Sequence, residues 1–343
     1  MKKYLLPNTG KFYKANLHCH TTCSDGKLTP AQVKELYQGL GFDIVAYTDH
    51  DSLIPHHELT DEKFLALTAA EIGFDEEGAP EGTPYTNLKV THINIIALEK
   101  DTIYQPGWNR TKYQPHHPEM VRFDENEPDF IREQTPEGIS RFMKLAKSKG
   151  FFVVYNHPDW SKENAIRYMQ YEGLDAVEII NGSDVVGGYE GYTPYVLDDY
   201  TDSGRRVFAV AGDDNHGSFG PGHRRCNAGT AYTMIKADKL EYREITKALE
   251  KGNFYCSEGP EIYELYIEDG NIYVKCSDAY LITCVYGTRL RRSVYGTEEE
   301  PVNQAVFEFP KNQKTFRIVV QTKDKKHACT NAYFYEDVIE GND

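Results

Sequence analysis

The chain has 343 residues, a formal net charge of −15 at neutral pH, and 40% hydrophobic and 27% charged residues. This length allows one large core, or a large and a small domain, and the composition is typical of soluble globular proteins. No stretch approaches the roughly 18 consecutive apolar residues of a membrane span. A negative surface repels nucleic-acid backbones. We therefore expect neither a membrane nor a nucleic acid as a partner.

The seven cysteines are odd in number and form no CxxC motif, which indicates reduced thiols. Lys2 and Lys3 precede a short apolar patch, so no intact signal peptide is visible. These features predict a cytoplasmic protein, although a processed exported form would look the same. The sequence does not predict the oligomeric state.

Seven apolar runs before residue 220 predict strands, at 13–19, 43–48, 64–71, 90–98, 151–156, 174–180 and 206–212. Helix starts are predicted where threonine precedes proline, at Thr29-Pro30, Thr135-Pro136 and Thr193-Pro194, and at a capping box formed by Asp238 and Glu241. Gly41, Gly150 and Gly204 mark expected helix ends. Strands that alternate with helices predict an α/β fold with a mostly parallel sheet, and seven strands whose C-terminal ends converge predict a barrel.

Two segments depart from this alternation. Residues 100–134 are polar, proline-rich and long for a connection, and we expect them to lie over the barrel mouth. After Gly259-Pro260 the pattern changes to short strands, beginning with a hairpin through Asp269-Gly270 and continuing at 280–286, 304–309, 315–321 and 331–336. We therefore predict a barrel over 1–258 and a β-sandwich-like appendage over 259–343.

Metal-type ligands occur beside most of the apolar runs. His18 and His20 close the first run, and Asp214 and His216 follow the last. Residues i and i+2 of a strand share a face, so each pair projects to one side. The sixth run, 174–180, offers no candidate, and we treat the isolated histidines His56, His57, His116, His117 and His327 as ordinary surface or core residues. The recurrence predicts a multinuclear metal hydrolase.

The motifs resemble those of the PHP (polymerase and histidinol phosphatase) superfamily. Asn16-Leu17-His18-Cys19-His20 through Ser24-Asp25-Gly26, then Tyr47-Thr48-Asp49-His50-Asp51, look like its first two motifs. Glu71, His92, Asn156-His157-Pro158 and Asp214-Asn215-His216 match the others in order. The resemblance covers residues 12 to about 258 and implies a distorted (β/α)7 barrel with three divalent metal ions.

The resemblance also implies a role for each ligand. His18, His20, Glu71 and Asp214 would hold a first ion, and Glu71 would bridge to a second ion held by His92 and His157. Asp25, His50 and His216 would hold the third, although some family members carry histidine where this chain has Asp25. Glu71, Asp214 and His216 would be the catalytic residues. We expect Asp213 to orient an imidazole or a water beside them.

Six imidazoles and three carboxylates would leave a surplus of positive charge around three divalent ions, which suits a phosphate dianion and a bridging hydroxide. Ligand type alone does not choose among Zn, Mn and Fe. We predict a metal-dependent phosphoesterase that hydrolyses a small phosphorylated metabolite by attack of a hydroxide that bridges two ions. A carboxylic or carbamic ester hydrolase, and a metal-binding scaffold without catalysis, remain alternatives.

Substrate contacts are harder to predict. His223, Arg224 and Arg225 follow the last ligand pair closely, and arginine pairs with oxyanions through two hydrogen bonds. A solvated surface cluster is an equally good interpretation of these three residues. Tyr189, Tyr192 and Tyr195 either line a pocket or reflect a chain rich in tyrosine.

Overall fold

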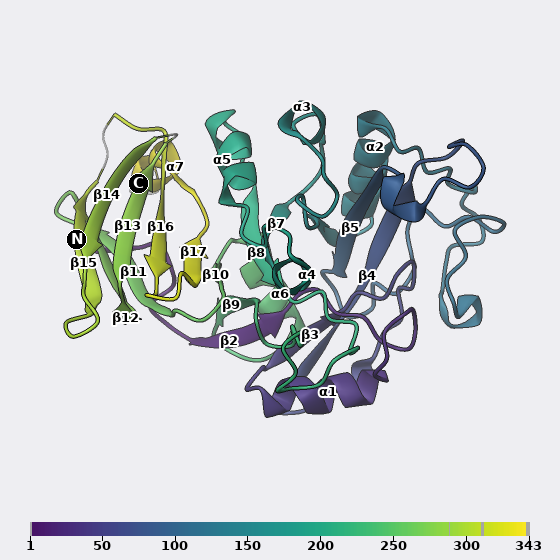
Figure 1. Ribbon diagram of the computed structural model, residues 1–343, viewed down its shortest axis with the longest axis horizontal. Coiled ribbons are helices and arrows are strands. Elements are labelled where there is room, and N and C mark those ends of the chain that lie inside the picture. The colour runs from purple at the N-terminus through teal and green to yellow at the C-terminus, as the bar shows by residue number, and fades with distance from the viewer. Residues whose placement is uncertain (1, 288, 310–311, 341–343) are drawn as a thin grey trace.

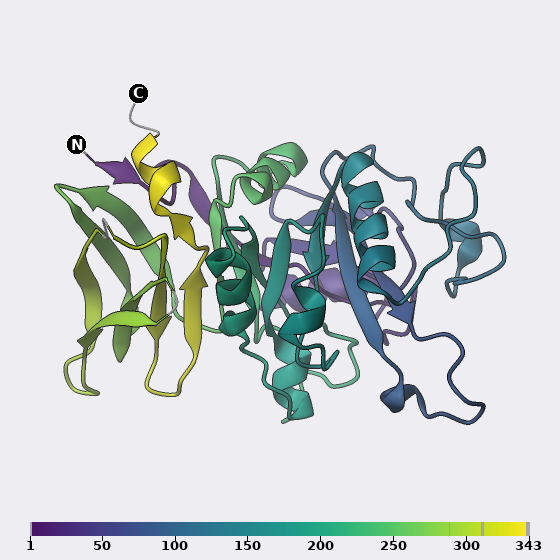
Figure 2. The same ribbon diagram turned by 90° about the horizontal axis from the view of Figure 1, so that it is seen from above.

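The structure is a computed structural model that describes residues 2–287, 289–309 and 312–340. Its first part is a mixed α/β arrangement, and a β-rich region built mainly from the C-terminal residues lies at one end (Figure 1). The view from above shows that the N- and C-terminal ends lie close together beside this β-rich region (Figure 2). Both chain ends are therefore remote from the loops of residues 76–134 at the opposite end of the molecule.

Seven strands of the large sheet follow one another in sequence order, and each overlaps one predicted apolar run. They are β2 (Lys11–Asn16), β3 (Ile44–Tyr47), β4 (Leu65–Asp75), β5 (Val90–Ala97), β6 (Phe151–Tyr155), β7 (Ala176–Asn181) and β8 (Phe208–Gly212). Beyond β8, Asn215 forms a parallel bridge with Cys19, which lies beyond β2. The backbone that follows the last strand of the series therefore pairs with the backbone that follows the first.

The strand β5 runs opposite to its neighbours. It pairs antiparallel with both β4 and β6, whereas β2–β3, β3–β4, β6–β7 and β7–β8 are parallel. The expectation that all seven strands converge at their C-terminal ends is thus wrong for β5. The segment between β4 and β5 contains only a 3-10 turn (Tyr85–Asn87), and no helix carries the chain back to start a parallel strand. His92 consequently lies near the N-terminal end of β5, at the same edge of the sheet as the C-terminal ends of the neighbouring strands.

Two of the four predicted helix starts are confirmed with their caps. In α1 (Pro30–Gly39), Thr29 forms a capping box with Gln32, and in α2 (Pro136–Ser148), Thr135 accepts a hydrogen bond from Gly138 N–H. The helix α5 (Pro194–Asp202) begins as predicted after Thr193 but without a side-chain cap. The other helices of this part are α3 (Ala165–Tyr168), α4 (Gly182–Gly187) and α6 (Tyr242–Glu250).

The capping box predicted for α6 is wrong. Its N-cap residue is Glu241 rather than Asp238, and Glu241 makes no side-chain cap hydrogen bond. The predicted helix ends are confirmed, because Gly41, Gly150 and Gly204 each adopt a positive φ just beyond α1, α2 and α5. Two further 3-10 turns lie at His57–Leu59 and Pro118–Met120.

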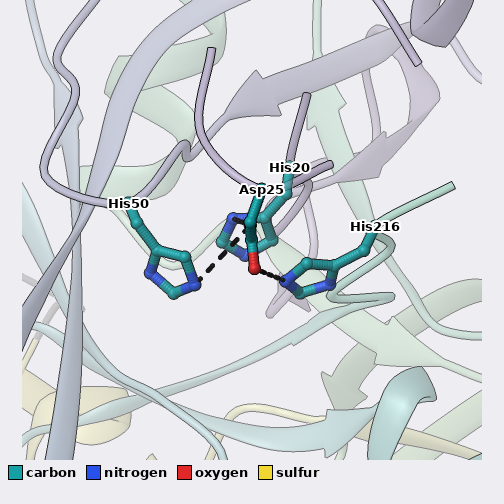
Figure 3. A group of neighbouring side chains, drawn as sticks. All are labelled: His20, Asp25, His50 and His216. Atoms are coloured by element: carbon teal, nitrogen blue, oxygen red, sulfur yellow. Dashed lines mark ion pairs between the residues drawn. The ribbon is translucent and has the colours of Figure 1, made fainter. Parts of the chain in front are cut away.

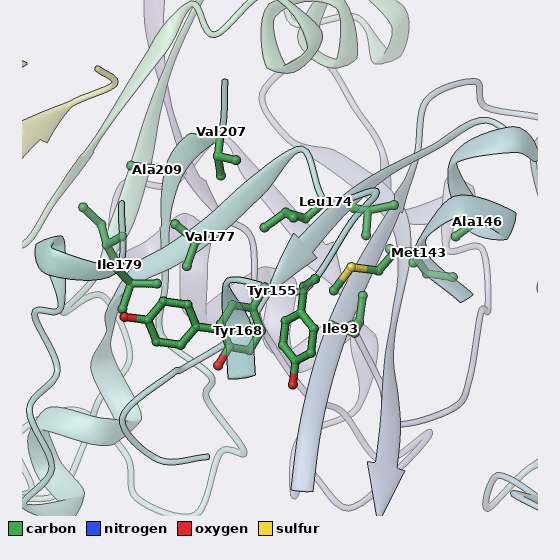
Figure 4. Packing of buried hydrophobic residues seen from close by; sticks show 14 of the residues in the cluster. Ile93, Met143, Ala146, Tyr155, Tyr168, Leu174, Val177, Ile179, Val207 and Ala209 are labelled. Carbon is green, nitrogen blue, oxygen red and sulfur yellow. The ribbon is translucent and has the colours of Figure 1, made fainter. Parts of the chain in front are cut away.

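A buried apolar core holds the helices on the strands. Met143 of α2 and Ile93 of β5 belong to the same buried cluster as Tyr155 of β6 and Val177 of β7 (Figure 4). Their side chains are almost entirely withdrawn from water, and this burial is the main favourable contribution to folding. The core fixes the strand ends that carry the ligand-type residues.

The C-terminal region forms two packed sheets. One contains β1 (Lys3–Tyr4), β11 (Ile262–Glu268), β12 (Asn271–Ala279) and β15 (Val302–Glu308). The other continues the large sheet from β2 through β9 (Tyr232–Ala237) and β10 (Phe254–Ser257) to β17 (His327–Thr330), β16 (Thr315–Gln321), β13 (Leu281–Tyr286) and β14 (Leu290–Tyr295), with β18 (Tyr333–Phe334) paired to β16.

The predicted hairpin through Asp269-Gly270 is confirmed, since both residues have positive φ in the turn between β11 and β12. The strand predicted at 331–336 is mostly wrong, because β18 covers two residues and α7 (Tyr335–Glu340) follows it. The division of the chain after residue 258 stays a prediction. Strand pairs cross it in both sheets, since β10 pairs with β17 and β1 pairs with β11.

Candidate metal centre

The structure brings all nine predicted ligands to one edge of the seven-strand series. Glu71 lies in β4 and His92 in β5, whereas the other seven lie on segments that follow β2, β3, β6 and β8. Figure 3 shows how His20, Asp25, His50 and His216, which come from three separate segments, point toward one another. Their use as metal ligands stays a prediction, but their convergence is a property of the fold.

The carboxylate of Glu71 lies at the centre of this cluster. Its Oε1 is 3.1 Å from His18 Nε2, His92 Nδ1 and His157 Nε2, and its Oε2 is 3.1 Å from His50 Nδ1 and 3.4 Å from His20 Nε2. The side chain is 1% exposed. An ionised carboxylate is buried in this way only when cations or hydrogen-bond donors compensate its charge.

The ligand atoms form four overlapping groups in which three or four side chains could hold one cation. The groups are His18 with Glu71 and His157; His18 with His20 and Asp214; His50 with Glu71 and His92; and His20 with Asp25, His50 and His216. Glu71 belongs to two of them, which agrees with a bridging role. The division into three sites that the resemblance implies differs in detail, because His92 groups here with His50 and His157 with His18.

Unpartnered nitrogen atoms provide a test of whether these residues fit a metal. His18 Nε2 and both ring nitrogens of His20 are buried without a hydrogen-bond partner. Buried polar atoms are rarely left in this condition, because each one loses its interaction with water. A cation that accepts lone pairs from the imidazoles would satisfy such atoms, and the mixture of imidazole and carboxylate suits a divalent ion.

The charges of the cluster shift the pKa values of its members strongly. Burial alone would lower the pKa of His20, but the nearby negative charges of Asp214 and Glu71, whose oxygens lie 3.2 and 3.4 Å from its Nε2, outweigh burial and raise this pKa to about 10. Burial would raise the pKa of Asp214 and of Glu71, yet the surrounding histidines hold both pKa values well below their ordinary range. The pKa of His50 falls to about 3, because of burial and the neighbouring His20. In the metal-free protein, the negative charge of the carboxylates is therefore compensated by protonated histidines such as His20.

Three non-glycine residues at this edge adopt the left-handed backbone conformation. They are Asp51, with φ of 52°, His157, with φ of 25°, and Asp214, with φ of 52°. This region is uncommon for residues with a Cβ atom, and such conformations concentrate at functional sites where packing enforces them. Two of the three, His157 and Asp214, are predicted ligands. The strained backbone therefore sets the direction in which predicted ligand side chains project.

A carboxylate that the sequence analysis missed holds one of the ligands. Glu178 of β7 accepts a hydrogen bond from His18 Nδ1 at 3.0 Å, and also from His157 N–H at 3.1 Å and Asn181 Nδ2 at 2.9 Å. A second carboxylate on the far nitrogen fixes the orientation of a ligating imidazole. The sixth apolar run therefore does contribute to the site. In the sequence, the feature that could have indicated this contribution is a lone glutamate inside the apolar run Ala176–Asn181.

The structure does not place Asp213 against an imidazole, so that part of its predicted role is wrong. Its carboxylate accepts hydrogen bonds from the N–H groups of Gly229, Thr230 and Ala231 and from the Tyr37 hydroxyl, at 2.6 to 2.9 Å. Asp213 is fully buried, and burial raises its pKa to about 6. It lies one residue out of phase with Asp214 and ties a loop to β8 instead of orienting an imidazole.

A fifth group of possible ligands, Cys23, Asp49 and His56, lies outside the predicted set. Both oxygens of Asp49 already accept hydrogen bonds, Oδ1 from Thr21 N–H and the Ser24 hydroxyl and Oδ2 from the Thr21 hydroxyl. We interpret this group as structural support for the turn that carries Asp25. Cys19 is fully buried, as expected of a small apolar residue.

The ligand cluster opens into a cavity of about 680 Å³. Seven of the nine predicted ligands line it, whereas His18 and His20 are buried and do not. Trp160, Tyr85 and Tyr189 are among the other residues of its wall. His116, which the sequence analysis treated as an ordinary histidine, also lines the cavity, and its Nδ1 contacts the backbone carbonyl of Ser24. The segment 100–134 thus reaches the cavity with Gln114 and His116, although it follows the end of β5 that lies away from the ligand cluster.

The predicted substrate contacts do not line this cavity. His223, Arg224 and Arg225 are exposed. The ring of His223 stacks on Phe219 at 4.5 Å, and the Arg225 guanidinium lies 4.6 Å from the same ring. Of the three tyrosines, Tyr189 lines the cavity, whereas Tyr192 stacks on His327. A substrate-binding role for the arginine pair stays a prediction.

Comparison with known proteins gives partial similarities. No model of a known protein family matches the chain. A segment of 89 residues is 32% identical to a 5'-3' exoribonuclease of Haemophilus influenzae, and covers 25% of this chain and 32% of that enzyme, so the chain matches about a third of its length. A segment of 150 residues is 23% identical to an uncharacterized protein of Methanocaldococcus jannaschii, over 39% of this chain and 68% of that protein.

A solved structure with similarity over most of the chain is a two-domain protein from Bacteroides vulgatus, described as containing a predicted PHP-like metal-dependent phosphoesterase. It covers 97% of this chain and 97% of its own, with 14% identity and a TM-score of 0.43. Within the described residues, no helix combines the length and apolar character needed to cross a membrane.

Proposed function

We propose that this chain is a metal-dependent phosphoesterase of the PHP type, acting on a small phosphorylated metabolite. The observation that carries the proposal is the convergence of six imidazoles and three carboxylates around the buried Glu71, beside an open cavity. The distorted (β/α)7 barrel is part of the same proposal, and the pairing of Cys19 with Asn215 supports it. The seven unpaired cysteines agree with a cytoplasmic location.

The residues of the chain would hold about three divalent ions, and Zn, Mn and Fe all suit the donor set. Ions bound there would acidify a water molecule and neutralise charge that develops on phosphoryl oxygens. Glu71, which belongs to two of the possible ligand groups, would contribute to more than one ion, and Asp214 and His216 would also be ligands. Glu178 would fix the His18 ring with its proton on Nδ1, which leaves Nε2 directed at Glu71.

One observation favours a second candidate function. Among the described residues that line the cavity there is no lysine or arginine. A phosphate group is commonly held by a guanidinium or ammonium group, whereas a carboxylic or carbamic ester needs no such partner. An ester hydrolase that uses the same metal centre therefore remains the competing proposal.

Elemental analysis combined with a substrate screen tests the proposal. Protein loaded separately with Zn, Mn or Fe would be assayed on phosphomonoesters, phosphodiesters and carboxylic esters, with Glu71→Gln as the inactive reference. We expect about three ions per chain and turnover of phosphomonoesters. One ion or fewer at saturation, or turnover confined to carboxylic esters, would contradict the phosphoesterase proposal.

A further inference from the structure

We propose that the cavity selects phosphomonoesters whose leaving group is a flat ring without a second negative charge, and that Asp75, Asp184 and Trp160 make this selection. The inference rests on the proposed function, because it concerns the part of the substrate that extends away from the metal centre. It assigns substrate-selecting roles to residues outside the ligand set.

The first step is the distribution of charge along the cavity. Three ligand carboxylates would be opposed by the charges of the bound ions, so the inner end would attract a phosphate. Asp75 and Asp184 line the same cavity without being members of any ligand group. The cavity would therefore be positive at the metal centre and negative beside Asp75 and Asp184, and we place the leaving group on the side of these two carboxylates.

The cationic side chains beside the cavity are already engaged with carboxylates. Arg132 lies 2.7 Å from Asp51, and Lys162 pairs with Asp159 at 3.0 Å while its ammonium group lies over the Tyr189 ring. Neither arginine nor lysine lines the cavity in the described part of the chain. A leaving group with its own carboxylate or phosphate would thus meet Asp75 and Asp184 without a compensating cation, which is unfavourable in a partly enclosed space.

Trp160 supplies the surface for a flat ring. Its indole packs against the rings of His157 at 4.9 Å and His92 at 5.2 Å, so two ligand side chains hold it in place. It lines the cavity and is partly exposed there. An indole held in one orientation at a cavity wall favours a planar partner over a puckered one.

Asp184 and Asp75 both line the cavity, but their surroundings differ. Asp184 is 3% exposed, at the start of α4, where Asn181 caps the helix by accepting from the Asp184 N–H at 2.9 Å. Asp75 ends β4, four residues beyond Glu71, and is exposed toward solvent. The two carboxylates thus come from different elements, and they would oppose an anionic group in more than one orientation.

The test uses a matched pair of substrates. The metal-loaded full chain would be assayed at pH 8 with 4-carbamoylphenyl phosphate and with 4-carboxyphenyl phosphate, which have similar shapes and differ by one negative charge. We expect kcat/KM to be about ten-fold higher for the amide, because the carboxylate meets unbalanced negative charge. In the double variant Asp75→Asn, Asp184→Asn this ratio should fall to about two-fold, since the opposing charges are gone. Glu244→Gln, on α6 away from the cavity lining, should keep the wild-type ratio.

A binding experiment separates this inference from the proposed function. The phosphonate analogues of both compounds would be titrated into the same metal-loaded proteins by calorimetry, which needs no turnover. Preferred binding of the amide without hydrolysis of either ester would support the selection and contradict the phosphoesterase proposal. Equal or better binding of the carboxylate by the wild type, or an unchanged ratio in the double variant, would overturn the selection.

The ring preference has its own measurement. Phenylphosphonate should bind the wild type several-fold more tightly than cyclohexylphosphonate, and Trp160→Leu should abolish that difference. Metal content is measured alongside, because Trp160 touches two predicted ligands. A Trp160→Leu protein with full metal content and an unchanged preference would remove Trp160 from the proposal.

Discussion

Glu71 shows how one residue organises the centre. Five imidazoles lie within 3.4 Å of its two oxygens, and no single proton arrangement lets one carboxylate satisfy all of them. Divalent ions held by the rings and the carboxylate would instead engage several of these nitrogen and oxygen atoms as ligands at once.

Replacing Glu71 by Gln should lower metal content by at least one ion per chain and reduce turnover about 100-fold or more, because the variant loses a charged group shared by neighbouring ions. Elemental analysis of the purified variant, followed by steady-state kinetics, checks both effects. Near-normal turnover with a full complement of metal would show that Glu71 does not bridge.

Glu178→Gln should weaken metal binding about 10- to 100-fold, because the amide holds the His18 ring less firmly than the carboxylate does. Competition with a chelator measures this affinity. Asp43→Asn is the matched control, since Asp43 also accepts a backbone hydrogen bond, from Lys14 N–H at 2.8 Å, but does not touch a predicted ligand. Equal metal affinities for the two variants would contradict an orienting role for Glu178.

Metal affinity should fall as the pH is lowered. In the metal-free protein the carboxylates raise the pKa of His20 to about 10, so His20 is protonated at pH 7 and must release its proton to bind a cation. Each displaced proton should weaken binding by up to about ten-fold per pH unit. The same raised pKa contributes stability to the metal-free fold that is complete below the ordinary value of 6.5 and is lost as the pH rises through about 10. Calorimetry at pH 6, 7 and 8, in two buffers of different ionisation enthalpy, counts the protons released, and a pH-independent affinity would refute the prediction.

At the scale of elements, the reversed strand β5 and the segment 100–134 act together. Because β5 runs the other way, His92 reaches the ligand edge from the start of its strand, and the segment that follows β5 begins at the opposite edge. Arg132 fastens this segment, since its guanidinium contacts Asp51 at 2.7 Å and donates to the Gly73 carbonyl at 2.9 Å. Asp51 adjoins the predicted ligand His50, so the fastening lies at the site.

Arg132→Leu should therefore lower the free energy of unfolding by about 3 kcal/mol, because it leaves Asp51 without its partner in a largely buried position. Arg110→Leu, in the same segment, should cost less than about 1 kcal/mol, since its pair with Asp129 is exposed. Denaturant unfolding of both variants gives the comparison. Similar losses would mean that Arg132 does not hold the segment.

The sequence predicted the elements well where local chemistry decides them. Apolar runs located seven strands, and Thr29 and Thr135 marked helix starts, because side-chain caps and burial patterns are local. The direction of β5 was missed because strand pairing depends on the whole sheet. Glu178 and His116 were missed for a related reason. Neither belongs to a motif, and each reaches the site through contacts between segments distant in sequence.

At the scale of the whole molecule, the α/β part and the C-terminal β region share strands and side-chain contacts. Arg317 of β16 forms a two-point ion pair with Asp198 of α5, at 2.9 and 3.0 Å, and the Arg317 side chain is 5% exposed. Asn331 accepts from Ala209 N–H of β8 at 2.8 Å and donates to the carbonyls of Gly252 and Phe254. The change of pattern at residue 259 predicted a second region but carried no information about these contacts.

We therefore expect the two parts to unfold together. In the full chain, circular dichroism and tyrosine fluorescence should report one coincident denaturant transition, because strand pairing through β10 and β17 and the Arg317–Asp198 pair connect the two cores.

Arg317→Leu should lower the midpoint by an amount equivalent to about 3 kcal/mol, since Asp198 would keep a partly buried charge without a partner. Lys275→Leu, on β12, is the control and should cost less than about 1 kcal/mol, since its pair with Glu264 is exposed. Two separate transitions in the wild-type chain, or an Arg317 variant as stable as the control, would show that the C-terminal region folds independently and that its contacts with α5 contribute little.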